Sequence, residues 1–401
     1  DTHPRSICFF TEQDAEAIAT APGAHKWRKL DIGNSLQHRT FTLMLGELKC
    51  EALRELDLSN NFIRETDREP PEWFSMLEKL DLSSCNFRAN AVTKLFEKRA
   101  FPNLTTFSLS GNELRGRGLQ ALSGSGRFPR LEGLALRSGQ LDPSDISTLT
   151  ALDMPALRRL AISRNELTPE TLRELLTSPF GRALVGFELT RTSDDVQAFA
   201  PLLEHPNLDH FEVLTIGLPT RFSLNSPAWG RRAANVPTQK HIEDASLVEE
   251  IITSIDPTCM KVLVLSGLTL TPKVAAHVAK MENLEHLNIE AASIDHDALC
   301  SLLAGNLRRL RYFNASALGL DDVALALFLE GPGKKSLTQL DLRRNVVGDD
   351  GAKALAYTEK LPKLSTLSLS ENQIGDDGCV AFIESTRFHA VDNLDIMNNR
   401  F

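Results

Sequence analysis

The sequence lacks several features that would place it in familiar protein classes. No uninterrupted apolar stretch in the 401 residues reaches the roughly 18 residues that a membrane-spanning helix needs, so no such helix is expected. The six cysteines are scattered and include neither a CxxC pair nor a zinc-ligand spacing. Disulfide frameworks belong to short, cysteine-dense secreted chains. We therefore expect reduced, mostly packed cysteines and a cytoplasmic or otherwise reducing compartment.

An excess of basic residues is also absent. The formal net charge is −9, from 53 acidic and 44 basic residues, which argues against a nucleic-acid partner. The two signs are mixed along the chain and form no blocks, so contact with a membrane surface is not expected either. The hydrophobic content of 42% supports a large buried core.

What the chain does have is an internal repeat of the form L-x-x-L-x-L-x-x-N. One of its clearest copies is Leu337, Leu340, Leu342 and Asn345. We find 14 copies, most of them 23 to 27 residues apart, with a single interval of 52. They begin at residues 27, 53, 77, 104, 131, 157, 184, 208, 260, 284, 307, 337, 364 and 391. The copy at 208 is aligned as Leu208-Phe211-Val213-Ile216, and a looser one as Leu307-Leu310-Tyr312-Ala315.

The residues of each copy predict its local structure. The L-x-L alternation has period two, so the leucines of a short strand face inward while their neighbours face outward. A single strand cannot bury its leucines, so the repeats must stack and each adds one strand to a sheet. The Asn amide both donates and accepts hydrogen bonds, which suits it to the turn that follows. Apolar stripes such as Leu172, Leu175 and Leu176 predict a helix in the second half of each repeat.

These repeats resemble those of the leucine-rich repeat family over nearly the whole chain. The phrases LDLRRNVVGDDGAKAL and LSLSENQIGDDGCVAF are similar to the ribonuclease-inhibitor-like subclass, which has a helix on its outer face. The resemblance implies the α/β class, as a curved solenoid or horseshoe with a parallel sheet on the concave face and helices on the convex face. We expect one continuous solenoid over residues 27–401, because stacked repeats share a single core.

Three segments depart from the repeat. Residues 1–26 are predicted to form an N-terminal cap or half-repeat. The long interval contains a basic loop insertion at about 219–240, which is either a tolerated surface loop or an arm with Trp229 as the anchor for a partner. The last copy ends at Phe401 without a helix or a polar cap. We expect a longer natural chain or an oligomer to cover that end.

Short strings that suggest enzyme chemistry have simpler interpretations. Residues 331–336 read GPGKKS, but Lys334 breaks the order of a phosphate loop, and the segment lies between a helix and the next strand. We interpret it as a connector. Asp295-His296-Asp297 aligns with the helix start of a later repeat and is interpreted as a turn. No catalytic triad or zinc set can be argued, so we predict no catalytic residue, no metal and no cofactor.

The exposed strand face is the remaining candidate site, because its positions are not constrained by the core. We rank a late cluster first, since an exposed phenylalanine beside arginines has the composition of a binding hot spot: Arg309, Arg311, Phe313 and Arg343. The central arginines come second, followed by an acidic and histidine stretch: Arg137, Arg159, Glu188, His210 and Glu212. Each of these is also compatible with an ordinary solvated surface.

The leading functional hypothesis is a non-enzymatic module that recognises a protein partner on its concave face. A rigid scaffold loses little entropy on binding, and charged zones set register and association rate. The resemblance implies roles such as an inhibitor, an immune-type receptor or a bacterial effector. Two alternatives remain open. One is the substrate-recognition part of a larger effector or ubiquitin-ligase enzyme. The other is a Ran-type GTPase-activating protein, although those carry an acidic tail that this chain lacks.

Overall fold

The computed structural model describes residues 17, 20–21, 23–34, 48, 50–63, 71–96, 100–124, 126–192, 195–218, 239–332, 334–386 and 391–401. Most of the predicted cap at 1–26 and nearly all of the predicted insertion at 219–240, with Trp229, lie outside the described residues. The chain forms two compact units, Asp1–Thr192 and Ser193–Phe401.

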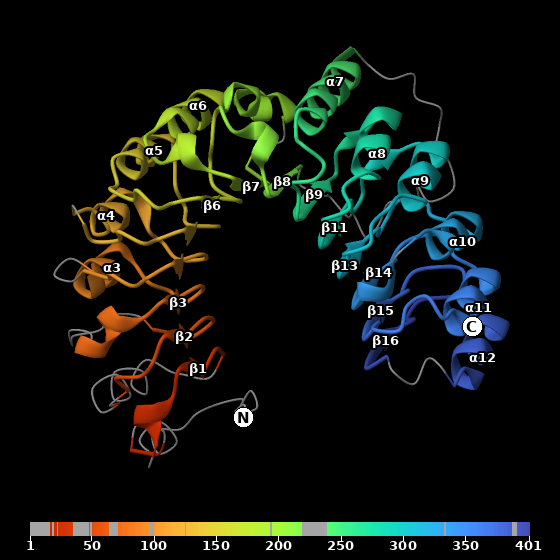
Figure 1. Ribbon diagram of the computed structural model, residues 1–401, viewed down its shortest axis with the longest axis horizontal. Coiled ribbons are helices and arrows are strands. Elements are labelled where there is room, and N and C mark those ends of the chain that lie inside the picture. Colours follow the sequence, from red (N-terminus) through yellow and green to blue (C-terminus); the bar gives the residue numbers. More distant parts are fainter. Residues whose placement is uncertain are drawn as a thin grey trace. The chain divides into compact units, whose positions relative to one another are not determined.

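The first unit is a series of strand–helix repeats with the helices along one side of the strands (Figure 1). Each strand pairs in parallel with the next one in the chain. The strands are β1 (Lys29–Asp31), β2 (Glu55–Asp57), β3 (Lys79–Asp81), β4 (Thr106–Ser108), β5 (Gly133–Ala135), β6 (Arg159–Ala161) and β7 (Gly186–Thr190). The helices are α3 (Ala89–Phe96), α4 (Arg115–Gln120), α5 (Pro143–Thr150) and α6 (Pro169–Thr177), with 3₁₀ turns η1 (Ala24–Lys26), η2 (Glu72–Met76) and η3 (Gly181–Ala183).

The second unit repeats this arrangement, again with parallel neighbours in chain order. Its sheet strands are β8 (Val213–Gly217), β9 (Val262–Ser266), β11 (His286–Asn288), β13 (Tyr312–Asn314), β14 (Gln339–Asp341), β15 (Thr366–Ser368) and β16 (Asn393–Asp395). A separate pair is β10 (Thr269–Leu270) and β12 (Ser293–Ile294). The helices are α7 (Gln239–Thr253), α8 (Pro272–Val278), α9 (His296–Leu303), α10 (Asp322–Glu330), α11 (Asp349–Tyr357) and α12 (Asp376–Glu384), with 3₁₀ segments η4 (Val196–Glu204), η5 (Leu208–His210) and η6 (Lys334–Ser336).

The fold class predicted from the repeat is confirmed. The main sheet order contains 14 strands among the described residues, one for each predicted copy. The middle residue of a three-residue strand faces the core, as Leu56, Leu80 and Phe107 do at directly paired positions of β2, β3 and β4. Parallel strands joined by helices are therefore the unit from which both halves of the chain are built.

Two copies of the repeat were aligned three residues too early. Leu214, not Phe211, pairs with Leu263, and Phe313, not Leu310, occupies the position next to Leu340. The physical reason is an additional buried leucine ahead of each strand, which satisfies the same three-residue spacing: Leu208 and Leu307. The shift reverses which side chains of these two strands point outward.

The predicted role of the repeat asparagines is confirmed, and Asn345 shows it fully. Its Nδ2 donates to the carbonyl of Leu342 in its own repeat and to that of Ala315 in the preceding one, both at 2.9 Å. Its Oδ1 accepts from the backbone N–H groups of Leu318 and Leu320 at 3.0 Å. Where Cys85 replaces the asparagine, its thiol donates to the Leu58 carbonyl instead, at 3.0 Å. Each repeat therefore completes the backbone hydrogen bonding of the one before it.

The turn after each strand has two recurring positions. An Asp or Asn at the strand's last residue accepts a hydrogen bond from the backbone N–H two residues on, as Asp57 does from Ser59 at 2.8 Å. One residue after that donor, the backbone has a positive φ, and we call this position the left-handed slot. Asn60 (φ 56) and Gly111 (φ 68) fit it easily, but Arg164 (φ 59) also occupies it. For side chains other than Gly, Asn or Asp, this conformation costs about 1–2 kcal/mol.

The C-terminal end of the second unit leaves apolar side chains exposed. The exposed fractions are 37% for Leu394, 67% for Met397 and 55% for Phe401. Contact of this end with a second copy of the chain stays a prediction. Within the described residues, every helix is too short or too polar to traverse a lipid bilayer.

Candidate functional site

The strand face is the side of each sheet that points away from the helices, formed by the first and third residues of the short strands. In the first unit it begins with a charged row of registered residues, Lys29, Glu55 and Lys79. Lys79 Nζ lies 2.7 Å from Glu55 Oε1, and this hydrogen bond lowers the pKa of the Glu55 carboxyl. Such exposed pairs contribute little to stability, but they hold the charges in fixed positions.

The central residues of the candidate site come together across three strands. Arg137 follows β5, and Glu188 lies in β7. Arg137 Nε donates to Glu188 Oε2 at 2.9 Å, and its Nη2 contacts the same oxygen. Arg159 occupies the first position of β6, with an exposed side chain. The prediction that these three residues share the strand face therefore agrees with their positions, while their role in binding stays untested.

The second unit presents a different surface, which we call the Tyr312 patch. Its members are mostly apolar or aromatic and lie on β8, β9, β11 and β13: Val213, Val262, Val264, His286 and Tyr312. The rings of His286 and Tyr312 stack, with centroids 4.2 Å apart and an interplanar angle of 10°. Burial raises the pKa of the Tyr312 hydroxyl, so it stays protonated at neutral pH. Both rings are half-buried by their neighbours and present their remaining surface outward.

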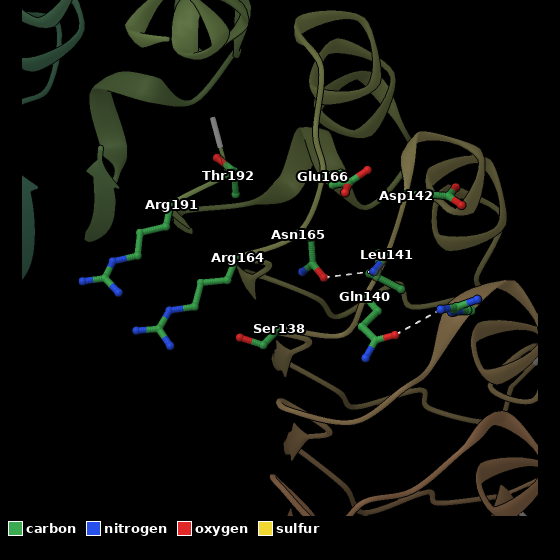
Figure 2. Close-up of a pocket in the computed structure, with 10 residues that line it drawn as sticks. Ser138, Gln140, Leu141, Asp142, Arg164, Asn165, Glu166, Arg191 and Thr192 are labelled. Carbon is green, nitrogen blue, oxygen red and sulfur yellow. Dashed lines mark hydrogen bonds between the residues drawn. The ribbon is translucent and has the colours of Figure 1, made fainter. Parts of the chain in front are cut away.

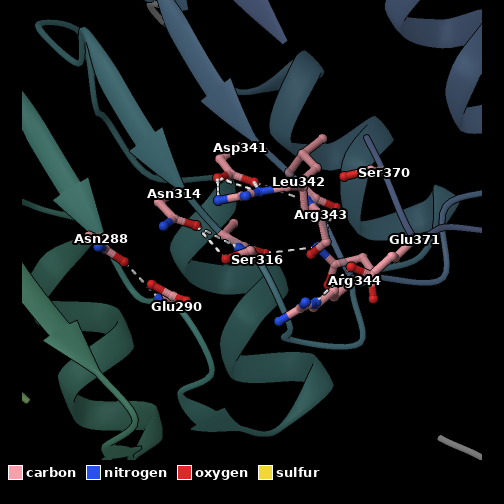
Figure 3. Close-up of polar contacts among 12 residues, drawn as sticks. Asn288, Glu290, Asn314, Ser316, Asp341, Leu342, Arg343, Arg344, Ser370 and Glu371 are labelled. Carbon is pink, nitrogen blue, oxygen red and sulfur yellow. Dashed lines mark hydrogen bonds and ion pairs between the residues drawn. The ribbon is translucent and has the colours of Figure 1, made fainter. Parts of the chain in front are cut away.

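Ion pairs surround the Tyr312 patch at both ends of its strands. Before the strands, Glu212 Oε1 lies 3.1 Å from Lys261 Nζ, and Glu285 Oε2 lies 3.5 Å from Arg311 Nε. Beyond them, Arg343 folds back onto Asp341, as Figure 3 shows. The Arg343 Nη2 to Asp341 Oδ2 distance is 2.6 Å.

Asp341 illustrates why several acids on the strand face are structural. It also accepts the backbone N–H of Arg343, at 3.1 Å. In Figure 3, Asn288 and Asn314 make the same backbone contact to Glu290 and Ser316. Outward positions of this kind are therefore constrained by the turn, although the core leaves them open.

The late cluster predicted from the sequence is only partly present. Phe313, predicted to be exposed, is fully buried, and its ring packs against Phe328 with centroids 5.3 Å apart. The misaligned copy explains the error, because Phe313 takes the inward position that leucine holds in other repeats. Arg311 and Arg343 are on the surface within the ion pairs described above, and Arg309 is exposed ahead of β13. The hot-spot argument built on Phe313 is therefore wrong.

The acidic and histidine stretch is also displaced. His210 belongs to η5, ahead of β8, and its Nδ1 lies 2.8 Å from Asp209 Oδ1. The hydrogen bond with Asp209 raises the pKa of His210, which is solvent-exposed. Glu212 immediately precedes β8 and does not occupy an outward strand position. The same three-residue error in alignment accounts for both.

Sequence reasoning placed His286 outward but missed Tyr312 as its outward neighbour. A signal was available, because Phe313 and Leu340 are separated by one repeat length, and Phe107 and Phe187 already show phenylalanine at the inward position. Placing Phe313 inward turns Tyr312 outward at once.

The connector interpretation of residues 331–336 is confirmed. Lys334 is 1% exposed, and its Nζ donates to the carbonyls of Leu303 and Gly305, both at 3.4 Å. Burial lowers its pKa to about 8. The ammonium faces backbone carbonyls and the Phe328 ring, 4.9 Å away, and holds the segment against the preceding repeat. Asp295 likewise caps α9 through the Ala298 N–H at 2.8 Å, as expected for a helix start.

Comparisons with known proteins agree with this architecture. Family models described as Leucine Rich repeat and Leucine Rich Repeat match residues 102–123, 333–356 and 360–382 and residues 52–77, respectively. A search of curated protein sequences found no match. One similar solved chain comes from the complex of Rad7 and Elc1 in yeast, with 22% identity, a TM-score of 0.62, and coverage of 80% of this chain and 76% of that chain.

Two bacterial structures are similar over greater lengths but superpose less well. An internalin from Listeria monocytogenes has 15% identity and a TM-score of 0.39, covering 96% of this chain and 94% of that one. A leucine-rich repeat protein from Leptospira interrogans has 15% identity and a TM-score of 0.37, covering 98% and 82%. The matched segments are leucine-rich repeats, and the sheet with one strand for each repeat shows the leucine-rich repeat fold in both units.

Proposed function

We propose that the chain is a non-enzymatic recognition module that binds a protein partner on the strand face of its second unit. The observation that carries the proposal is the Tyr312 patch. It joins a stacked His286–Tyr312 pair to half-buried valines and is bordered by ion pairs. An apolar, aromatic centre with a charged rim is the anatomy of a protein–protein interface.

The surroundings of the patch support binding without large rearrangement. His286 and Tyr312 lie on directly paired residues of adjacent strands, so backbone hydrogen bonds fix their separation. Stacking restricts both rings before any partner arrives. Because little side-chain entropy is then lost on association, more of the contact energy is available as affinity. The flanking pairs set the orientation of the partner through charge.

Two further assignments belong to this proposal. The helices that follow many strands favour the ribonuclease-inhibitor-like subclass of leucine-rich repeats. A reducing compartment such as the cytoplasm fits the buried thiols of Cys50 and Cys85, each of which donates a hydrogen bond to a backbone carbonyl at 3.0 Å. A thiol can make this bond, whereas a disulfide sulfur has no proton to donate.

The experiment compares a patch variant with a matched control. The patch variant carries His286→Ser and Tyr312→Ser. The control carries Gln339→Ser and Thr366→Ser, which are the next residues of the same registered row on β14 and β15. Affinity purification with quantitative mass spectrometry identifies proteins captured by the wild type, and calorimetry then measures their affinity for all three chains.

We expect the patch variant to bind the captured partner at least tenfold more weakly while the control matches the wild type. Circular dichroism confirms that both variants are folded. Equal affinity of the wild type and the folded patch variant for every captured protein would show that the Tyr312 patch is ordinary surface.

A further inference from the structure

A pocket of about 280 Å³ lies on the second unit at the C-terminal ends of the strands. Its walls come from the turns that follow β11, β14 and β15 and from the end of β16. They include Glu290, Arg343, Ser370, Asp395 and Met397. We call it the Ser370 pocket.

The hydroxyl of Ser370 has no hydrogen-bond partner in the part of the chain that the structure describes. The residue is only 6% exposed, and it lines the pocket. Its backbone carbonyl, in contrast, accepts the N–H of Arg344 at 3.0 Å. Burying a hydroxyl without a partner costs free energy. A hydroxyl kept in this position indicates a hydrogen bond that a ligand completes.

A larger cleft in the first unit, of about 770 Å³, shows how polar side chains beside these turns are used elsewhere (Figure 2). Gln140 Oε1 accepts from Arg115 Nη2 at 3.3 Å. Asn165 Oδ1 accepts the backbone N–H of Leu141 at 3.1 Å. Both groups are engaged by the protein itself, and the Ser370 hydroxyl differs from them in this respect.

Both arginines of the Ser370 pocket already have carboxylate partners. Arg343 Nη2 lies 2.6 Å from Asp341 Oδ2. Arg344 Nε lies 3.0 Å from Glu371 Oε1 (Figure 3). Each of these two positive charges is therefore matched by one negative charge.

Two further carboxylates of the pocket are not matched in this way. Within the described residues, neither Glu290 nor Asp395 forms an ion pair. Asp395 Oδ1 accepts the backbone N–H of Met397 at 3.1 Å, which is the turn contact that Asp57 also makes, and its second oxygen has no partner there. The pocket therefore carries excess negative charge close to the Ser370 hydroxyl.

The pocket also has an apolar wall and adjoins the Tyr312 patch. Met397 is 67% exposed. After burial, the charges of Asp341 and Glu290 also contribute to the raised pKa of the Tyr312 hydroxyl, so both carboxylates lie near that ring. A segment that covers the rings can therefore extend one side chain into the pocket.

We propose that the Ser370 pocket receives a basic side chain, arginine or lysine, of the protein that binds the Tyr312 patch. Asp395 supplies the opposite charge, and the Ser370 hydroxyl accepts an N–H of the cation. Met397 covers the methylene stem, as apolar surface does for long basic side chains. Glu290 adds negative potential at the opposite wall. The inference rests on the proposed function and specifies the chemistry of the partner.

Ligand-observed NMR with small probes tests the pocket without any partner protein. The probes are N-acetyl-arginine N-methylamide and its lysine and citrulline equivalents, of which citrulline has the shape of arginine without its charge. The test variants are Asp395→Asn and Ser370→Ala. Asparagine keeps the turn contact, as Asn288 does in another repeat. The matched control is Asp57→Asn, which removes one charge at the same turn position in the first unit.

We expect the wild type and Asp57→Asn to bind a basic probe at least about threefold more tightly than the citrulline probe, as a partly exposed ion pair allows. The basic probe that binds more tightly identifies the side chain. Asp395→Asn should lose most of that preference. Ser370→Ala should bind the basic probe more weakly while unfolding no earlier than the wild type.

A wild type without preference for a basic probe overturns the proposal, and so does a preference that survives Asp395→Asn. Either result leaves the Tyr312 patch to be judged by its own variant, because His286→Ser with Tyr312→Ser changes the rings and none of the pocket residues. Failure of the pocket and failure of the patch are therefore distinguishable.

Discussion

Arg137 and Glu188 form an ion pair that crosses an entire strand. Arg137 follows β5 and Glu188 lies in β7, with β6 between them, and Arg137 Nε still lies 2.9 Å from Glu188 Oε2. The residue of β6 that registers with Glu188 is Ala161, whose side chain is small. A longer side chain there would occupy the space that the arginine crosses. Side-chain choice on three strands therefore fixes two charges of the strand face in one arrangement.

We predict a modest, salt-sensitive coupling between these two residues. In a double-mutant cycle with Arg137→Met and Glu188→Gln, the interaction energy should be about 0.5–1 kcal/mol, because both side chains are partly exposed. It should fall towards zero in 1 M NaCl, where the screening length is about 3 Å. Urea unfolding supplies the four stabilities. A coupling that persists unchanged at high salt would point to packing and not to charge.

Substitutions at two adjacent residues of β13 should show by their effects on stability which residue faces the core and which faces outward. Phe313→Ala empties a fully buried site and should lower the free energy of unfolding by about 3–5 kcal/mol. Tyr312→Ala removes a half-buried ring and should cost less than half as much. Urea unfolding followed by circular dichroism measures both. The reverse order of stabilities would restore the alignment that places Phe313 outside.

Asn345→Ala should destabilise the second unit by at least about 2 kcal/mol. The substitution removes the bonds to the Ala315 carbonyl and to the Leu318 and Leu320 N–H groups, all buried where water cannot replace them. Asn393→Ala, at an exposed position of β16, is the control and should be close to neutral. Hydrogen exchange of the Leu318 and Leu320 amides reports the loss locally. Unchanged protection there would contradict the assigned role.

Lys334 predicts an unusual dependence of stability on pH. Burial lowers its folded-state pKa from 10.5 to about 8, so between these values the unfolded chain binds more protons than the folded one. Stability attributable to this group therefore rises as pH increases through that window, and its charging penalty is fully present below about pH 8. Lys334→Met should flatten the rise, whereas Lys335→Met, at the exposed neighbour, should not. Urea midpoints between pH 7 and 9.5 provide the comparison.

The sequence predicted the strands well because the inward leucines repeat with a fixed period. It misplaced Phe313, because Leu307 and Leu310 satisfy the same spacing, and the pairing of Phe313 with Leu287 and Leu340 is what distinguishes the two frames. Pairing between neighbouring repeats is tertiary information.

Hydrogen bonds between repeats could not be predicted from the sequence either. The acidic pair in the first turn of α11 predicts a helix start, but Asp349 Oδ1 also accepts the N–H groups of Gly375 and Gly378 in the next repeat, at 2.7 and 2.9 Å. The local sequence pattern therefore indicates the helix start but gives no sign of the hydrogen bonds to the next repeat. The candidate site was the hardest part to predict, because the outward residues follow no repeating pattern in the sequence. Their partners are also distant in the sequence: Glu188, the partner of Arg137, is 51 residues away.

The asparagines that reach back one repeat have a consequence for the newborn chain. As the ribosome releases the protein, the turn of the most recent repeat still has unpaired backbone groups. The side-chain amide that pairs with them is about 27 residues further along the chain, as Asn345 is for the Leu318 N–H. Ordered structure should thus trail the growing end by one repeat, and every newly emerged segment secures its predecessor. A pause in translation would leave one loose turn at the growing end, while the repeats already completed behind it stay closed.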